Sequence, residues 1–367
     1  MKRLIYPQYT TPDGFKFETV PKPVLGAPNE VLVKIYAASI NPIDVKRARG
    51  SLKFLFNNPM PSPIGFDFSG VVEEVGKDVT EFSYGDRVFA TMTEEYRGTF
   101  QEFCVIPAEM LSKIPENMSF EDAAALSLAG QTALDALDMV IADKEEGAEW
   151  FKGKTVFIVA GLSSTGSTAA MLAKNVYGAE KVIITASSKK VPLVAEYLGE
   201  GVVDQVIDYK TEDPTKVIAP KSIDLVLATQ DFGFQYLHLM KPGGEIVSLV
   251  AIPDVPLFLR PDSPFPSYFG PVVRLYSKIV EYRASRYQTT FHGAMSYSTK
   301  EKQDRLAKYA AEGKIHAVIA KVCNFSDQDA VLDMFTLVNA ETGYTGKMVA
   351  RIGQPFNVSV PRGFFYA

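Results

Sequence analysis

The sequence is poor in residues that bind metals or form cross-links. Its 367 residues include only two cysteines, Cys104 and Cys323, and three histidines, His238, His292 and His316. Two cysteines far apart in sequence cannot form a disulfide framework or a four-thiolate zinc site. The histidines are not paired with other ligands at a metal-binding spacing. We therefore expect a protein that works in a reducing compartment. We also expect that it binds no structural metal.

Long apolar runs and basic clusters are also missing. The sequence contains no run of about 18 apolar residues, so it predicts no membrane helix. The apolar stretch in residues 1–7 is too short for a signal peptide. Lys and Arg number 38 against 43 Asp and Glu, a net charge of -5. This balance, with no basic cluster beside stacking aromatics, argues against nucleic acid as a partner. We expect a soluble, cytoplasmic protein of two domains, with association with lipid droplets or mitochondria left open.

Three stretches of the chain differ in texture. Up to about residue 126, short β-type runs at 30–37, 68–75, 87–91 and 99–106 alternate with Pro and Gly. A helical, Ala-rich segment follows from Phe120. Strand-length apolar runs separated by helix-length segments come next, as in parallel βαβ units, at 155–160, 181–185, 203–207, 224–228 and 245–250. The tail from residue 313 returns to β-type runs, at 318–322 and 347–352, around a predicted helix at 327–338.

The segment 251–291 breaks this rhythm. Six prolines between residues 253 and 271 exclude a continuous helix at its start, where we expect a loop or lid. Apolar residues then recur at helical spacing and predict an amphipathic helix, at Val272, Leu275, Tyr276, Ile279 and Val280. We favour core packing or a subunit contact, as in a homodimer, for this face. Peripheral contact with a lipid surface is the alternative.

A strand, a tight loop of small residues and a helix follow one another at residues 154–176. The loop carries Ala160, Ser163 and Gly166 where a dinucleotide-binding loop has the glycines of G-x-G-x-x-G. Small residues let the backbone approach a pyrophosphate, which the helix N-terminus also favours. The hydroxyls of Ser163, Ser164 and Thr165 add donors, while Gly166 must stay small. An ordinary βα turn is the alternative.

The residues after the next strand indicate which nicotinamide cofactor is used. Where an acid would hold an adenosine ribose, the sequence has Ser187, Ser188, Lys189 and Lys190. Hydroxyl and ammonium groups suit a 2′-phosphate, since its extra charge needs charge-assisted donors. We therefore expect NADPH as cofactor. The alternative is that Ser187 or Ser188 only caps a helix that begins at Pro192.

Short motifs follow one another along the chain: Asn41-Pro42-Ile43-Asp44, Pro63-Ile64-Gly65-Phe66-Asp67-Phe68-Ser69-Gly70, Gly85-Asp86-Arg87-Val88, Gly98-Thr99-Phe100, Ala129-Gly130-Gln131-Thr132-Ala133, Val206-Ile207-Asp208-Tyr209 and Lys241-Pro242-Gly243-Gly244. These motifs and their order resemble those of the medium-chain dehydrogenase/reductases, most closely a fungal-type form of their zinc-independent quinone oxidoreductase branch. The resemblance covers residues from about 25 to about 350.

The resemblance implies an α/β protein of two domains with the active site in the cleft between them. A Rossmann-type, doubly wound parallel sheet is expected at residues 127–312, with an insertion at about 251–291, as the NADPH-binding domain. A GroES-like, partly open β-barrel is expected at residues 1–126 and 313–367 as the catalytic domain. The positions that hold the catalytic zinc in related alcohol dehydrogenases match Asn41, Phe66 and about Leu128 here. Only the neighbouring Asp67 could ligate a metal, so no zinc is expected.

The resemblance also implies roles for single residues. The amide of Asn41 would position the nicotinamide or the substrate oxygen, or else form an Asx turn before Pro42. Asp44 would orient this loop rather than transfer a proton. Thr132 would contact the nicotinamide ribose or phosphate, and Tyr209 the adenosine side. Val45 and Lys46 stand where related reductases often carry a tyrosine, which leaves the proton donor unassigned.

Together these features predict an NADPH-dependent oxidoreductase. Without a Lewis acid, hydride transfer needs an acceptor whose conjugation spreads the developing negative charge onto a carbonyl oxygen. Quinones and α,β-unsaturated carbonyl compounds are such small-molecule substrates. The alternative is an NADPH-binding protein with little or no turnover, acting in stress response or at a lipid surface.

Overall fold

The computed structural model describes residues 1–53, 59–93, 95–251, 270–340 and 344–353. The chain forms two compact units, one of Met1–Gln131 with Ser298–Ala367 and the other of Thr132–Tyr297. We predicted domain boundaries at 126/127 and 312/313. The boundaries between the two units lie at 131/132 and 297/298. Residues 252–269, where a loop or lid was expected, are outside the described part of the chain.

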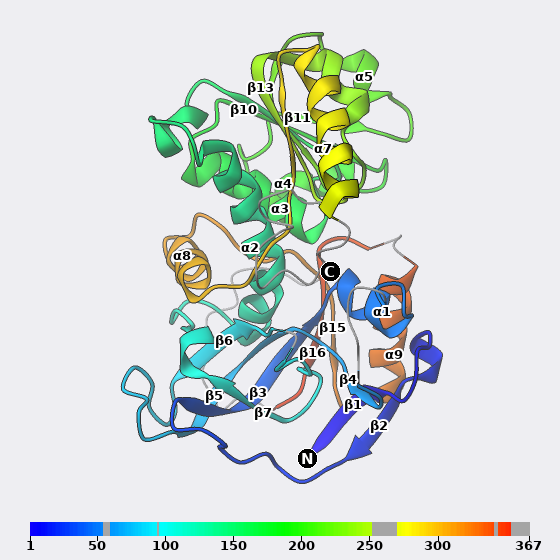
Figure 1. The fold of residues 1–367 in the computed structure, drawn as a ribbon. Helices are drawn as coiled ribbons and strands as arrows, with labels where there is room; N and C mark the ends of the chain where they lie inside the picture. The colour runs from blue at the N-terminus through cyan, green and yellow to red at the C-terminus, as the bar shows by residue number, and fades with distance from the viewer. Residues whose placement is uncertain (54–58, 94, 252–269, 341–343, 354–367) are drawn as a thin grey trace. The chain divides into compact units, whose positions relative to one another are not determined.

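The first unit is built on two sheets (Figure 1). A three-stranded sheet has the order β2-β1-β4, and a larger sheet has the order β15-β16-β3-β5-β6-β8, with β7 paired to β3. The strands are β1 (Lys2–Tyr6), β2 (Lys16–Thr19), β3 (Glu30–Ile40), β4 (Ser62–Pro63), β5 (Asp67–Val75), β6 (Arg87–Thr91), β7 (Phe103–Pro107), β8 (Ser112–Lys113), β15 (Ile319–Asn324) and β16 (Lys347–Arg351).

The described helices that lie wholly in the first unit are α1 (Pro42–Ala48), α8 (Lys300–Ala311) and α9 (Gln328–Asn339). Helix α8 explains the corrected boundary, because its buried face lies against this unit. Its fully buried Leu306 lies so close to Gly130 that a Cβ there would be 2.8 Å from Leu306 Cδ1. Gln303 Nε2 also donates to the carbonyl oxygen of Met110 at 3.1 Å.

The second unit contains a six-stranded parallel sheet with the order β11-β10-β9-β12-β13-β14. Its strands are β9 (Thr155–Ile158), β10 (Lys181–Ala186), β11 (Gln205–Asp208), β12 (Ile223–Ala228), β13 (Met240–Ser248) and β14 (Thr290–Gly293). Its helices include α3 (Ser164–Met171), α4 (Val194–Leu198), α5 (Pro214–Val217) and α7 (Gly270–Ser285). Strand order reverses between β9 and β12, and doubly wound sheets bind ligands beyond the strand ends at such a point.

Helix α2 (Phe120–Ile141) includes the boundary between the two units. Its length and hydropathy alone would suit a membrane span, and it is the one such helix among the described residues. However, 67% of the relevant window is buried inside the protein. A core helix shows this pattern too, so α2 is weak evidence for a membrane span.

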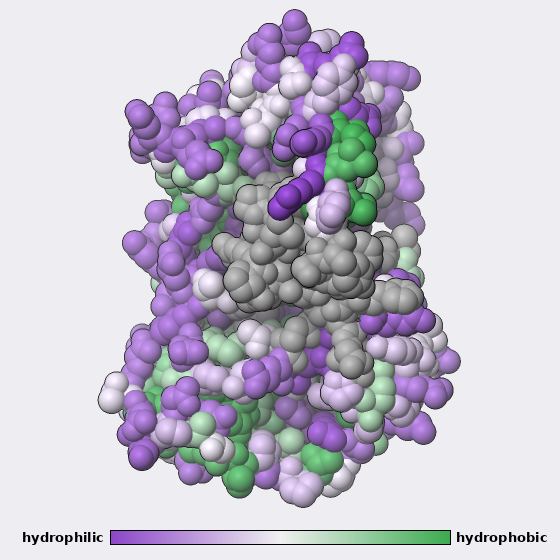
Figure 2. Space-filling model, in the orientation of Figure 1, coloured by the Kyte–Doolittle hydropathy of each residue, from purple (hydrophilic) through white to green (hydrophobic). Residues whose placement is uncertain are grey.

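Helix α7 forms as expected, and the apolar face predicted for it is buried only in part. Val280 is buried as predicted and Tyr276 is half-buried, joined by the buried Val273 and Ala284. By contrast, three of the predicted core positions are exposed by half or more, and with Tyr282 they form an apolar surface (Figure 2): Val272 61%, Leu275 62% and Ile279 52%. Both faces of this helix carry apolar residues, so periodicity alone could not choose between them.

Candidate functional site

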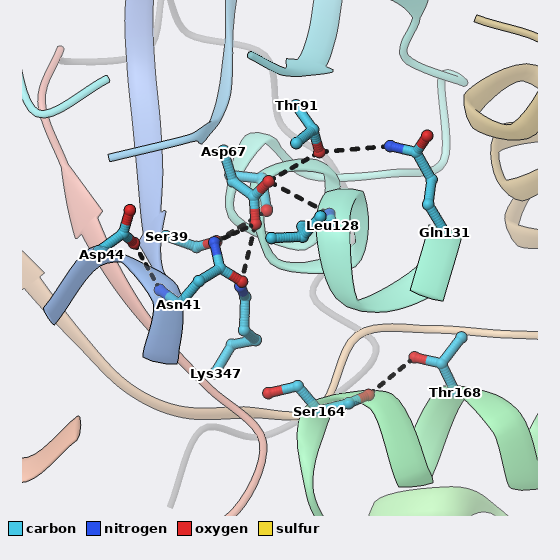
Figure 3. Close-up of polar contacts among 11 residues, drawn as sticks. Ser39, Asn41, Asp44, Asp67, Thr91, Leu128, Gln131, Ser164, Thr168 and Lys347 are labelled. Carbon is cyan, nitrogen blue, oxygen red and sulfur yellow. Dashed lines mark hydrogen bonds and ion pairs between the residues drawn. The ribbon is translucent and has the colours of Figure 1, made fainter. Parts of the chain in front are cut away.

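Buried polar side chains gather where three neighbouring strands of the first unit end (Figure 3). We call this group the Asp67 cluster, which consists of Ser39, Asn41, Asp67, Thr91 and Lys347. Each is at most 4% exposed. Strand register brings them together, because Ser39 pairs with Asp67 across β3 and β5, and Asp67 pairs with Thr91 across β5 and β6. Strand β16, which carries Lys347, pairs with the other side of β3.

Asp67 is the centre of this cluster. Its Oδ2 accepts hydrogen bonds from Asn41 Nδ2 at 2.8 Å and from Lys347 Nζ at 3.0 Å. Its Oδ1 accepts from Thr91 Oγ1 at 2.8 Å and from the backbone N–H of Leu128 at 3.2 Å. A carboxylate offers about four lone-pair sites, so these four donors satisfy it. A fifth group, Ser39 Oγ, lies 3.1 Å from Oδ2 and 2.9 Å from the carbonyl oxygen of Ala124.

The cluster engages both ends of the Asn41 amide. Asn41 Oδ1 accepts from Lys347 Nζ at 2.5 Å while Nδ2 donates to Asp67. Its backbone N–H donates to Asp44 Oδ2 at 2.7 Å at the start of α1. Burial, partly opposed by that hydrogen bond, raises the pKa of Asp44 to about 7. The hydrogen bond links Asp44 to the Asn41 loop, and the orienting role expected of Asp44 stays a prediction.

The second unit contains the predicted strand, loop and helix. Ala160 has a left-handed φ of 54°, and its N–H donates to Thr185 Oγ1 at 2.8 Å. Ser163 caps α3, since its Oγ accepts from the N–H of Gly166 at 3.1 Å. A Cβ at Gly166 would lie 2.4 Å from the carbonyl oxygen of Ala160. Gly166 therefore has to lack a side chain, for the packing reason predicted from the sequence.

The other hydroxyl residues of this loop lie at the start of α3. Ser164 and Thr165 are half-buried within the first turn. The carbonyl oxygen of Ser164 accepts from Thr168 Oγ1 at 3.1 Å (Figure 3). Free N–H groups and the positive end of the helix dipole meet at such a turn, which can hold a phosphate.

The presumed 2′-phosphate residues follow β10, with Ser188 and Lys189 exposed and Ser187 and Lys190 half-buried. The helical segment after them begins at Val191, and no side-chain hydrogen bond caps it. Ser187 and Ser188 are therefore not helix caps of the kind considered as the alternative. A carboxylate nevertheless lies beside these residues, because Ser188 hydrogen-bonds Asp208 and lowers the pKa of that acid. Asp208 arrives from β11, which pairs with β10 through Ala186.

Two further cofactor candidates lie elsewhere in the second unit. Tyr209 directly follows β11 and is 49% exposed, with Lys210 Nζ 5.2 Å from its ring centroid. Thr132 is half-buried on α2. Tyr209 thus lies at the same edge of the sheet as residues 187–190. Thr132 lies on helix α2 and not on the sheet.

Comparison with known proteins identifies the family. Residues 27–116 match the alcohol dehydrogenase GroES-like domain, and residues 203–349 match the zinc-binding dehydrogenase family. The 2-methylene-furan-3-one reductase of Solanum lycopersicum is 31% identical over 357 residues, covering 95% of this chain and 78% of that protein. The chain belongs to the medium-chain dehydrogenase/reductases, in their quinone oxidoreductase-like branch.

Two other relatives agree with this placement among oxidoreductases. The chloroplastic NADPH-dependent alkenal/one oxidoreductase of Arabidopsis thaliana is 33% identical over 70% of this chain, an alignment that spans 64% of that protein. The quinone oxidoreductase of Coxiella burnetii has a TM-score of 0.77 at 28% identity, covering 96% of this chain and 99% of that one. The expected fold class, a Rossmann-type sheet with a GroES-like domain, is confirmed.

The family description of residues 203–349 implies zinc, but the residues of this medium-chain reductase do not fit a zinc site. The resemblance places Asn41, Phe66 and about Leu128 at the matching ligand positions, and hydrogen bonds fill the lone-pair sites of Asp67. Lys347 Nζ already contacts the two side-chain oxygens that a metal would need. Among the described residues, no group of three or more His, Cys, Asp or Glu is placed to hold a metal ion.

Sequence reasoning missed three residues of these sites. Lys347 was read only as the start of a strand, although a lysine in an otherwise buried strand was a usable signal. Asp208 belongs to a quoted motif, but its approach to Ser188 depends on the pairing of β10 with β11. Gly161 was not singled out, yet a Cβ there would lie 2.4 Å from Ile184 Cβ.

Proposed function

We propose that this protein is an NADPH-dependent reductase of α,β-unsaturated carbonyl compounds or quinones that works without zinc. The observation that carries the proposal is the replacement of a metal site by the satisfied Asp67 cluster. An enzyme without a Lewis acid requires an acceptor that takes a hydride readily, and conjugated carbonyls meet this condition. The names of the alkenal/one and methylene-furanone reductases support the same acceptor class.

The second unit supports a nicotinamide cofactor as the hydride donor. Its strand order is that of a dinucleotide-binding sheet, and the β9–α3 loop lies at the point where this order reverses. In this proposal the turn at Ser163, Ser164, Thr165 and Gly166 binds the pyrophosphate. The left-handed Ala160 and its bond to Thr185 hold that turn in shape before the cofactor arrives.

Lys189 and Lys190 support NADPH over NADH, and Asp208 opposes it. Burial lowers the pKa of Lys190. A 2′-phosphate beside this lysine would stabilise its charged form. Replacing both lysines by Glu should therefore weaken NADPH binding at least tenfold, since each charge-assisted bond is worth about 1.5 to 3 kcal/mol. Asp208→Asn should strengthen the binding of NADPH relative to that of NADH. Fluorescence titrations with both cofactors measure this, and equal affinities of the parent for NADPH and NADH would contradict the preference.

Turnover separates a reductase from a cofactor-binding protein. Loss of the NADPH absorbance band is followed with a panel of quinones, alkenals and cyclic enones, and with a saturated ketone as a matched control. We expect turnover with conjugated acceptors and none with the saturated ketone. Tight NADPH binding with no consumption by any acceptor would instead support the non-catalytic alternative.

A further inference from the structure

Helix α7 has one side in the core of the second unit and another side in solvent. Val280 and Ala284 anchor it, because both belong to the buried apolar core of this unit. The apolar surface of α7 consists of four exposed residues: Val272, Leu275, Ile279 and Tyr282. Their spacing places them on one side of the helix, along about 15 Å at about 1.5 Å per residue. Since the other side anchors the helix, these side chains are available to a partner.

Positive charge borders this apolar surface, where hydrophilic side chains lie beside hydrophobic ones (Figure 2). With about 3.6 residues per turn, Arg274 and Lys278 lie along one edge of the surface and Arg283 along the other. Arg286 follows the end of the helix, and Glu281 is the one acidic residue of α7. These four cations and one anion are all exposed and carry a net charge of +3, although the net charge of the whole chain is -5.

This charge distinguishes between two occupants that the apolar residues alone would fit, a second copy of the chain and a lipid surface. In a two-fold contact between copies the same patch faces itself, so the positive charge of one α7 would face that of the other. Like charges across an interface oppose association. A bilayer with anionic phospholipids attracts the cations and also accepts the apolar side chains. The observed combination therefore favours the lipid surface.

We propose that α7 docks the protein on a membrane surface that carries anionic phospholipids. The helix would lie in the plane of the interface, with Leu275 and Ile279 entering the outer part of the acyl chains. Arg274 and Lys278 would keep their charges at the level of the phosphates. Tyr282 suits the headgroup level, because its ring is apolar and its hydroxyl is polar. The inference goes beyond the proposed function and does not depend on it.

The first test measures binding of the full chain to vesicles by co-sedimentation. Vesicles of phosphatidylcholine are compared with vesicles of equimolar phosphatidylcholine and phosphatidylserine. We expect the parent to sediment with the anionic vesicles and to stay in solution with the neutral ones. High salt should release it, because salt screens the attraction between exposed charges. Equal binding to both kinds of vesicle, or no binding to either, would overturn the inference.

Two substitutions remove the apolar contribution. Leu275→Gln with Ile279→Gln keeps the helix propensity of α7 and should weaken binding to the anionic vesicles at least tenfold, since burial of each apolar side chain is lost. The matched control, Val24→Gln with Tyr84→Gln, changes two exposed side chains of the first unit and should bind as the parent does. Circular dichroism shows that the variants fold. Parent affinity in a folded Leu275→Gln, Ile279→Gln protein would contradict the proposal.

Two further substitutions remove charge. Arg274→Gln with Lys278→Gln should weaken binding about fivefold for each cation. The control, Lys152→Gln with Lys216→Gln, removes the same charge from other exposed positions of the second unit and should keep the parent affinity. An equal loss in both proteins would mean that only the net charge of the chain matters, which would overturn a specific role for α7.

A spectroscopic measurement locates the contact independently of affinity. The parent contains one tryptophan, Trp150, so Tyr282→Trp adds a reporter on the apolar surface. Anionic vesicles with brominated acyl chains should quench the Tyr282→Trp protein more than the parent. No additional quenching would overturn the inference. A parent dimer in analytical ultracentrifugation that dissociates in the Leu275→Gln, Ile279→Gln protein would also overturn it, in favour of a second copy.

Discussion

Asp44 is a carboxyl group whose ionisation the fold resists. Its pKa is raised to about 7 by burial, against about 3.9 in an unfolded chain. Between these values the folded protein keeps a proton that the unfolded chain has released. The contribution of Asp44 to the free energy of unfolding is therefore greatest below about pH 4 and falls as the pH rises toward 7.

Asp44→Asn should remove this pH dependence while keeping an acceptor for the N–H of Asn41. The variant should gain stability over the parent as the pH rises, by up to about 4 kcal/mol at pH 8 at about 1.4 kcal/mol for each pKa unit. Urea unfolding of both proteins at pH 5 and pH 8 measures the difference. The same difference at both pH values would show that Asp44 is ionised throughout.

Adding one methyl group at Gly166 tests the phosphate-binding role of the loop. Gly166→Ala adds a Cβ that would lie 2.4 Å from the carbonyl oxygen of Ala160, so the turn must open and NADPH binding should be lost. Ser164→Ala removes one hydroxyl and should cost only about 1 kcal/mol, or about fivefold in affinity. Circular dichroism shows whether both variants fold. A folded Gly166→Ala protein with the parent affinity would make the loop an ordinary turn.

At the scale of helices and strands, apolar runs and the alternation of apolar and polar residues were sufficient to predict a strand where its pairing is local. The run at 87–91 forms β6 with the predicted bounds, and the five apolar runs of the middle stretch form β9 to β13. The run at 99–106 is shorter as a strand, because its first residues are used by other partners: Phe100 bonds Ile64 and Leu4 instead. Strand β14 was not predicted, since its four residues follow α7 without a pattern of their own.

Strands β13 and β14 are joined by a buried acid. Glu245 accepts from Lys144 Nζ at 2.7 Å and lies 2.9 Å from His292 Nε2. Burial acts to raise the pKa of Glu245, but the bonds from His292 and Lys144 outweigh it and hold the pKa below its usual value. The unfolded chain therefore binds more protons in acid, so this stabilisation is complete above about pH 5 and is lost as the pH falls through the folded pKa.

Glu245→Gln should destabilise the protein by about 3 kcal/mol at pH 7, because it breaks a buried ion pair. The difference from the parent should shrink as the pH falls through the folded pKa of Glu245, which lies below its usual value. Glu312→Gln, which removes an exposed ion pair with Lys314, is the matched control and should change nothing measurable. Urea unfolding at pH 7 and pH 3.5 measures this difference in stability. An equal loss of stability at both pH values would contradict the role assigned to Glu245.

At the scale of the whole molecule, composition and motif order were enough to predict the two-unit architecture. The sequence assigned α8 to the wrong unit, because its contacts with Gly130 and Met110 join residues far apart in the chain. The Asp67 cluster was unpredictable for the same reason, since Lys347 and Asn41 are 306 residues apart. The apolar surface of α7 leaves both the subunit and the lipid-surface alternatives as predictions.

The proposed reaction is hydride transfer from NADPH to a conjugated acceptor. NADPH deuterated at the transferring position of the nicotinamide C4 is incubated with the protein and a cyclic enone, and the product is analysed by mass spectrometry and NMR. We expect a saturated ketone with deuterium at the β-carbon and none at the α-carbon, which takes its proton from water. Deuterium that stays on the nicotinamide, or an enone recovered unchanged beside tightly bound NADPH, would contradict it.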